Sequence, residues 1–164
     1  MSSSGPLRPQ FHFTPQAHWI NDPNGLVYLD GEYHLFYQYH PHSDLWGPMH
    51  WGHAVSRDLI RWDELPIALY PDELGAIFSG SAVIDSANTA GFGAAAMIAI
   101  FTHDASNRQS QSLAYSLDNG RSWTKYANNP VLNPPDNTPD FRDPKVFWYG
   151  DASSGHWVML LAVN

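Results

Sequence analysis

Two aspartates stand directly before prolines, Asp22 in Asn-Asp-Pro-Asn-Gly and Asp143 in Arg-Asp-Pro. Proline fixes its own φ and restricts the preceding residue to extended conformations, so we expect each carboxylate to be held in one orientation. Paired carboxylates around an anomeric carbon are the machinery of glycoside hydrolysis. For Asp22 taken alone, a structural turn is the simpler interpretation. A role in glycoside hydrolysis requires a fold that brings both aspartates together.

Composition narrows the class of protein. The chain has 164 residues, of which 43% are hydrophobic, enough for one domain with a real core. Its net charge of −8 and its eight scattered Lys and Arg argue against nucleic acid or an anionic membrane as partner. It has no cysteine, which excludes disulfides and thiolate metal sites, and no signal peptide or apolar run of membrane-spanning length is seen, so its localisation stays open. An aromatic content of 14% suits both a β-sheet core and sugar binding.

Strand signals dominate, and no segment shows a helical period. Residues 25–29 and 32–39 flank Asp30-Gly31, which predicts a hairpin. Two further hairpins are expected, one pairing residues 78–84 with 96–102 and one pairing 144–149 with 156–163. The sequence therefore predicts an all-β fold.

An internal repeat points to a β-propeller. Residues 54–62 and 114–123 both read Ala-x-Ser-x-Asp followed closely by Trp, which predicts a strand, a tight turn capped by the Ser and Asp side chains, and an outer strand anchored by Trp. Repeated four-stranded units are typical of propeller blades, and a β-sandwich with coincidental turns is the alternative. The chain holds two complete units and the first hairpin of a third, about two and a half blades of an incomplete propeller.

Equivalent positions on the innermost strands of a propeller converge on its axis. The starts of the three units supply Asn21-Asp22, then Phe78-Ser79, then Arg142-Asp143. We therefore expect residues far apart in sequence to meet around one funnel, with two carboxylates among them.

Three ordered blocks carry a resemblance to a known family: His-Trp-Ile-Asn-Asp-Pro-Asn-Gly at 18–25, Phe-Ser-Gly-Ser at 78–81 and Phe-Arg-Asp-Pro at 141–144. Together with Tyr-Gln-Tyr at 37–39 and the segment 46–54, they resemble family 32 glycoside hydrolases, the β-fructofuranosidases that include invertases, inulinases and levanases. The match covers nearly the whole chain from about residue 11. It implies that residues 11–164 form the N-terminal part of a five-bladed propeller hydrolase domain, after a flexible segment 1–10.

The resemblance implies a role for each matched residue. Asp22 would be the nucleophile that attacks a terminal fructosyl unit, in a double displacement with retention. Asp143 would bind sugar hydroxyls, and Arg142 would pair with carboxylates and help to keep them ionised. The remaining substrate-binding residues would be hydrogen-bonding Asn21, Gln38 and Ser79 and the apolar wall of Trp19, Trp46 and Phe78.

One family feature has no counterpart. The family's general acid is a Glu beside a Cys, whereas this chain has no Cys, and Glu32, Glu64 and Glu73 lie in other contexts. General acid catalysis contributes roughly 10²- to 10⁴-fold, so these 164 residues alone are expected to be nearly inactive. Two alternatives stay open: a propeller fragment that binds fructosides without cleaving them, and a five-bladed hydrolase acting on arabinosides or xylosides.

Several other features receive structural interpretations. Asp58 and Asp118 are expected to cap turns, and four tryptophans (Trp62, Trp123, Trp148 and Trp157) to pack in the blades. The pairs His40/His42 and His50/His53 lack helical spacing, so we expect neither a metal site nor a cofactor. Residues 134–139 read as a solvated linker. The expected partner is a fructose-containing oligo- or polysaccharide, and open propeller edges predict self-association.

Overall fold

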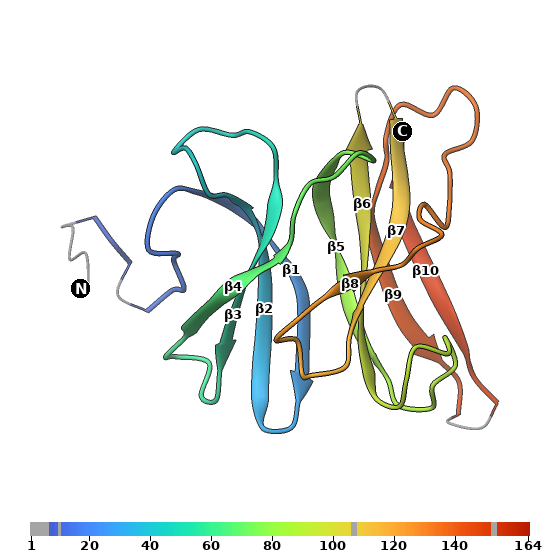
Figure 1. Cartoon of the computed structure of the whole chain (residues 1–164), viewed down its shortest axis with the longest axis horizontal. Coiled ribbons are helices and arrows are strands. Elements are labelled where there is room, and N and C mark those ends of the chain that lie inside the picture. Colours follow the sequence, from blue (N-terminus) through green and yellow to red (C-terminus); the bar gives the residue numbers. More distant parts are fainter. Residues whose placement is uncertain (1–6, 10, 106–107, 152–153) are drawn as a thin grey trace.

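The computed structural model describes residues 7–9, 11–105, 108–151 and 154–164. Within these ranges every regular element is a strand, and Figure 1 shows three sheets side by side, running from blue through green and yellow to red. The described residues contain no helix able to cross a membrane. The all-β prediction is confirmed.

The three sheets follow the order of the chain. The first contains β1 (Trp19–Leu29), β2 (Glu32–His40), β3 (His50–Ser56) and β4 (Asp63–Leu69), and the second contains β5 (Ala76–Asp85), β6 (Ala96–Ala105), β7 (Arg108–Ser116) and β8 (Thr124–Lys125). The third pairs β9 (Phe141–Tyr149) with β10 (His156–Val163). All neighbours are antiparallel, and β1, β5 and β9, the first strands of the sheets, contact one another in that order. Two four-stranded blades and a two-stranded third confirm the predicted incomplete propeller.

The first strand includes the Asn-Asp-Pro-Asn-Gly segment, which the simpler interpretation had placed in a turn. Strand β1 begins at Trp19, which pairs with His40, and it continues through Pro23. A turn at these residues is therefore wrong. Pro23 is accommodated because β1 lies at the edge of its sheet. A strand there has a hydrogen-bonded neighbour on one side only, so a missing N–H on the other side costs no hydrogen bond within the sheet.

Each first strand carries a β-bulge near its start. In β1 the bulge holds Asn21 and Asp22 opposite the single residue Gln38. In β5 it holds residues 78–79 opposite Thr102, and in β9 residues 143–144 opposite Leu161. A bulge bends its strand and re-aims side chains, so the three blades use one device to turn residues toward the same region.

Strand β6 joins the two apolar cores because alternate residues of a strand face opposite sides. Met97, Ala99 and Phe101 pack with Trp51 and other buried residues of the first blade. Ile98 and Ile100, on the other side, pack in a cluster with Val146 of β9 and with Trp157. The blades are therefore fixed to each other through the second blade.

Both copies of the repeat form the predicted turn. The Ser56 hydroxyl accepts from the N–H of Leu59 (2.8 Å), and Asp58 accepts from the N–H of Arg61 (2.7 Å). In the second copy the Ser116 hydroxyl and the Asp118 carboxylate accept from N–H groups of the turn, both at 2.8 Å. The indoles of both repeat tryptophans donate back to turn carbonyls. Turn-capping by the two aspartates is confirmed.

The ends of the chain bear on two further predictions. The predicted flexible segment 1–10 lies mostly outside the described residues, although Arg8 donates to the carbonyls of Thr14 and Pro15. At the other end, β10 pairs only with β9 among the described residues, and Leu160 and Val163 are exposed. Self-association through this edge stays a prediction.

Candidate active site

One pocket gathers residues from the starts of all three first strands. It has a volume of about 270 Å³. Eight of the nine predicted site residues line it: Asn21, Asp22, Gln38, Trp46, Phe78, Ser79, Arg142 and Asp143. The expected convergence is therefore confirmed as geometry, while the roles of these residues stay predictions.

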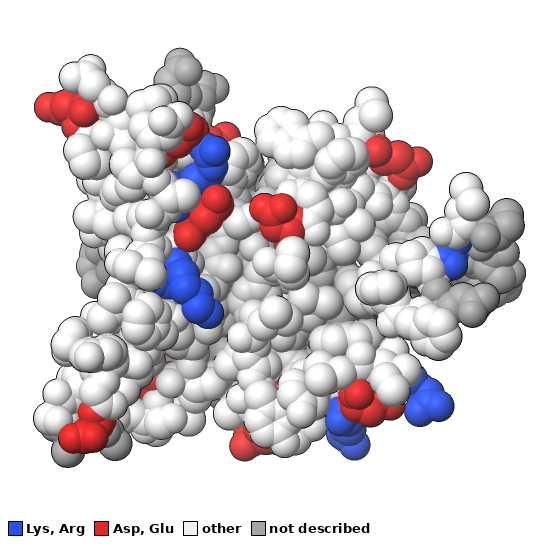
Figure 2. Space-filling model, turned by 180° about the vertical axis from the view of Figure 1, so that it is seen from behind, with Lys and Arg blue, Asp and Glu red and all other residues white. Residues whose placement is uncertain are grey.

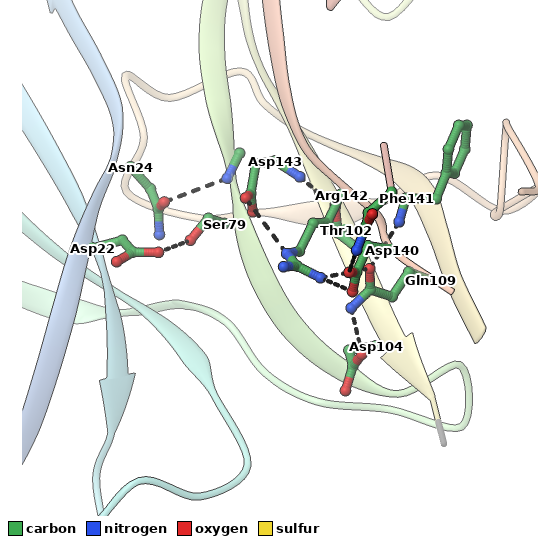
Figure 3. A network of polar contacts seen from close by, with 12 residues as sticks. Asp22, Asn24, Ser79, Thr102, Asp104, Gln109, Asp140, Phe141, Arg142 and Asp143 are labelled. Atoms are coloured by element: carbon green, nitrogen blue, oxygen red, sulfur yellow. Dashed lines mark hydrogen bonds and ion pairs between the residues drawn. The ribbon is translucent and has the colours of Figure 1, made fainter. Parts of the chain in front are cut away.

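Asp22 is oriented by a residue of the second blade. The Ser79 hydroxyl donates to Asp22 Oδ2 (2.7 Å), and the two side chains face each other across the gap between β1 and β5 (Figure 3). No hydrogen bond to Asp22 Oδ1 is found among the described residues. Asp22 is exposed and lines the pocket, and the bond from Ser79 fixes only one of its two carboxylate oxygens.

Glycine follows Ser79 for a steric reason. A Cβ atom at Gly80 would lie 2.0 Å from the carbonyl oxygen of Ile100, a backbone atom of the neighbouring strand. Only glycine allows β5 to approach β6 this closely beside the bulge. The Phe-Ser-Gly-Ser block thus joins a pocket-lining pair to the glycine that positions it.

Two buried amides support the floor of the site. Gln38, only 2% exposed, lies opposite the β1 bulge. Asn24 is equally buried, and with its amide oriented to suit its neighbours its oxygen accepts from Gln38 Nε2 (3.0 Å) and from the Trp51 indole (3.3 Å). Sequence reasoning missed Asn24, although its place in the same block as Asp22 was a signal.

Two of the three predicted aromatic residues line the pocket, and the third contacts a residue that lines it. Trp46 and Phe78 meet edge to face with ring centroids 6.2 Å apart, and both line the pocket. Trp19 does not line it, and its indole N–H instead donates to Asn21 Oδ1 (2.7 Å). Trp19 thus contacts the site through Asn21, which differs from the predicted place in the wall.

Asp143 has an unexpected backbone conformation. Its φ is +58°, so the extended conformation predicted from the following proline is wrong. Asp143 is the first residue of the β9 bulge, and aspartate tolerates left-handed backbone better than most residues. Its orientation is therefore fixed by the bulge and by the contacts of its main chain.

Arg142 pairs with two carboxylates. Its guanidinium contacts Asp140, and its Nε lies 3.7 Å from Asp143 Oδ2. Burial raises the pKa of Asp143, Arg142 lowers it, and the negative charge of Asp22 raises it further, so the net change is upward. Arg142 thus pairs with carboxylates and lowers the pKa of Asp143 in the predicted direction, but burial has the larger effect and the pKa of Asp143 is raised overall.

The three glutamates lie elsewhere. Glu32 pairs with Arg121 (2.5 Å) and Arg57 (3.8 Å) at the first hairpin, and neither Glu64 nor Glu73 lines the pocket. A larger hollow of about 490 Å³ does include Glu64, but it lies between the N-terminal segment and β4. It draws on the first blade and the residues before it, whereas the smaller pocket joins all three blades.

The histidines have local partners. His53 lies 3.0 Å from His34, His50 contacts the carbonyl of Pro48, and His40 that of Leu45. No group of three or more His, Cys, Asp or Glu side chains in the described ranges could hold a metal ion. On the face shown in Figure 2, Lys and Arg occur in separate small groups.

Comparison with known proteins gives a consistent result. The model of the glycosyl hydrolases family 32 N-terminal domain matches residues 12–164. A levanase of Bacillus subtilis is 63% identical over 160 residues, which are 96% of this chain and 23% of the levanase. An invertase of Schizosaccharomyces pombe is 46% identical, with coverage of 96% and 28%. The chain thus spans about a quarter of the length of these relatives.

Solved structures agree. A crystal structure of exo-inulinase from Aspergillus awamori superposes with a TM-score of 0.88 at 44% identity, covering 98% of this chain and 36% of the inulinase. A β-fructofuranosidase from Schwanniomyces occidentalis, solved with fructosyl-erythritol, gives 0.86 at 44% identity, with coverage of 94% and 31%.

Proposed function

Because the chain belongs to glycosyl hydrolase family 32, we propose that it supplies the nucleophile-bearing part of an active site that cleaves terminal β-fructofuranosyl units. Levanase, exo-inulinase and invertase among its relatives suggest levan, inulin and sucrose as substrates. The observation that carries the proposal is the single pocket in which Asp22, Ser79 and Asp143 meet from three blades.

Asp22 is the proposed nucleophile. Its Oδ2 is held by Ser79, which leaves Oδ1 to attack the anomeric carbon while the bond to the leaving oxygen breaks. The product is a fructosyl ester of Asp22, and water then attacks the same carbon and releases the carboxylate. Two inversions give net retention.

Asp143 is proposed to bind the fructosyl hydroxyls and not to attack. Its main chain is fixed in a left-handed conformation within the β9 bulge, so its carboxylate cannot readily follow a moving carbon. Hydrogen bonds to a charged acceptor strengthen as positive charge develops on the sugar ring, which favours the transition state over the bound substrate.

The leaving oxygen needs a proton from an acid outside this pocket lining. None of the three glutamates lines the pocket. We therefore propose that residues 1–164 bind and orient the fructosyl unit but hydrolyse it poorly by themselves, because general acid catalysis contributes about 10²- to 10⁴-fold.

The test is an assay of the protein at its full natural length on sucrose, inulin and levan. Asp22→Asn is expected to lower kcat by more than about 10³-fold, since loss of a nucleophile removes the covalent route. Asp136→Asn, an exposed aspartate in the 134–139 linker, is the matched control and should retain full activity.

Two results would overturn the proposal. The first is an Asp22→Asn variant that is folded and keeps more than about one part in 10³ of its turnover. The second is activity on arabinofuranosides or xylosides with none on the three fructosides. Binding of fructosides without turnover by the natural protein would support the non-catalytic alternative instead.

A further inference from the structure

The segment Phe141–Asp143 is held from the second blade by side chains rather than by a strand. Gln109 Oε1 accepts from the N–H of Phe141 (3.0 Å), and Gln111 Nε2 donates to the carbonyl of Phe141 (2.6 Å). The Thr102 hydroxyl oxygen accepts from the N–H of Asp143 (3.2 Å). These three bonds join the second blade to the start of β9, and Figure 3 shows Thr102 and Gln109 close to Phe141, Arg142 and Asp143.

The three holding side chains are themselves locked. Thr102 and Gln111 are directly opposite on β6 and β7, and the Thr102 hydroxyl donates to Gln111 Oε1 (2.7 Å). Gln109 is opposite Asp104 in the same way and donates to its carboxylate (3.0 Å). Thr102 and Gln111 are fully buried, and Gln109 is 7% exposed. Buried polar side chains whose bonds are all made hold one geometry, because any movement leaves a group unpaired.

Thr102 lies where one face of β6 changes from apolar to polar residues. Ile98 and Ile100 share their face of the strand with Thr102 and Asp104, since alternate residues point the same way. The isoleucines form the apolar cluster with Val146 of β9. Toward the pocket the same face becomes polar, and it becomes so beside the bulge that holds Asp143.

We propose that Thr102, Gln109 and Gln111 are positioning residues that fix the left-handed backbone of Asp143 and so aim its carboxylate into the pocket. The inference rests on the proposed function, because the aim of Asp143 matters only if the carboxylate binds the substrate. A left-handed non-glycine residue at a bulge persists only when its surroundings determine it, and these three side chains bond to the main chain on both sides of Arg142.

The chain contains a matched control at the other end of the same interface. The Thr89 hydroxyl oxygen accepts from the Trp157 indole N–H (2.7 Å), so this threonine also links the second blade to the third. The contact involves β10 and the loop after β5, away from the residues that line the pocket. If an effect arises only from weaker contact between the blades, variants of Thr89 should show it as well as variants of Thr102.

The experiment compares Thr102→Val, Thr102→Ser and Thr89→Val in the protein at its full natural length. Each is purified as a monodisperse folded fraction, and kcat and KM on sucrose are measured with the melting temperature. Thr102→Val keeps the shape but removes both hydroxyl bonds, so we expect kcat to fall at least tenfold. Thr102→Ser keeps the hydroxyl and should stay within threefold of the parent, and Thr89→Val should lower only the melting temperature.

The outcomes separate the two proposals. Unchanged kcat in Thr102→Val, while Asp143→Asn shows a large loss of activity, overturns the positioning role and leaves the proposed function intact. Full activity of Asp143→Asn overturns the proposed function instead. An equal fall in kcat for Thr89→Val and Thr102→Val shows that only blade contact matters, which also refutes the positioning role. Should Thr102→Val not fold, the less buried Gln109→Met decides by the same criterion, with at least a fivefold fall in kcat expected.

Discussion

The bulges of β1 and β9 each place one aspartate at the same pocket, but they orient it in different ways. Counted from the start of each bulge, Asp22 is the second residue, after Asn21, whereas Asp143 is the first, before Pro144. Asp22 keeps an ordinary backbone and is oriented through its side chain by Ser79. Asp143 has a φ of +58° and is oriented through its main chain.

The difference fits the two roles proposed for these aspartates. A group that forms and breaks a covalent bond needs one free oxygen and some freedom to move, and a single hydrogen bond to the other oxygen leaves both. A group that recognises hydroxyls gains from being fixed in advance, because no ordering has to occur during the reaction. Two Asp-Pro pairs that look equivalent in sequence are therefore not equivalent in the fold.

After the loss expected for Asp22→Asn, the next largest effect is expected at Asp143, where the charge can be removed without changing the backbone. Asparagine tolerates left-handed backbone, so Asp143→Asn should keep the bulge and lose only the carboxylate. We expect kcat/KM for sucrose to fall about 10²- to 10³-fold, the usual cost of losing one preorganised partner of the transition state. Steady-state kinetics on the full-length protein measure this.

The same variant should not lose stability. The pKa of Asp143 is raised in the folded state, so the carboxyl favours folding at low pH, and this contribution is lost as the pH rises through the folded pKa. At neutral pH Asp143→Asn should therefore melt at or slightly above the parent temperature, with the gap closing in acid. Asp143→Ala is the comparison, because alanine in this conformation costs about 1–2 kcal/mol and should lower the melting temperature. A clearly destabilised Asp143→Asn would contradict this.

A smaller effect is expected at the β1 side. Ser79→Ala removes the only hydrogen bond found to Asp22 among the described residues. Hydrogen bonds to charged groups contribute roughly 1.5–3 kcal/mol, and the exposure of this pair puts the effect at the lower end, about tenfold in kcat. Ser86→Ala, an exposed serine just after β5, is the control. If the two variants have equal kcat, Ser79 does not orient the proposed nucleophile, Asp22.

Much of this arrangement could be predicted from local signals in the sequence. The Asp30-Gly31 hairpin and the two Ser-x-Asp turns follow from residue types alone, and the repeat gave the blade count. The ordered blocks also identified the residues that line the pocket, with Trp19 the exception.

The bulges and the polar contacts behind Asp143 could not be predicted in this way. A bulge depends on the register between two strands, and no local pattern in residues 19–24 reveals an extra residue opposite Gln38. Proline rules predicted an extended Asp143, whereas its φ is +58° at a bulge where Thr102 accepts from its N–H and the two glutamines of β7 bond to Phe141. The available signal was Gln109-x-Gln111, two amides on one face of a largely buried strand.

The smallest expected effect tests whether the two aspartates sense each other across the pocket. The charge of Asp22 is the least of the causes that act on the pKa of Asp143, after burial and Arg142, and it acts upward. Replacing Asp22 by Asn removes that charge, so the pKa of Asp143 should fall, and a carboxyl-carbon NMR titration of the full-length protein can follow it. Asp118, whose pKa of about 2 is set by bonds within its own turn, should titrate identically in both proteins. A pKa of Asp143 that stays constant would mean that the two carboxylates are too far apart or too well screened to interact electrostatically.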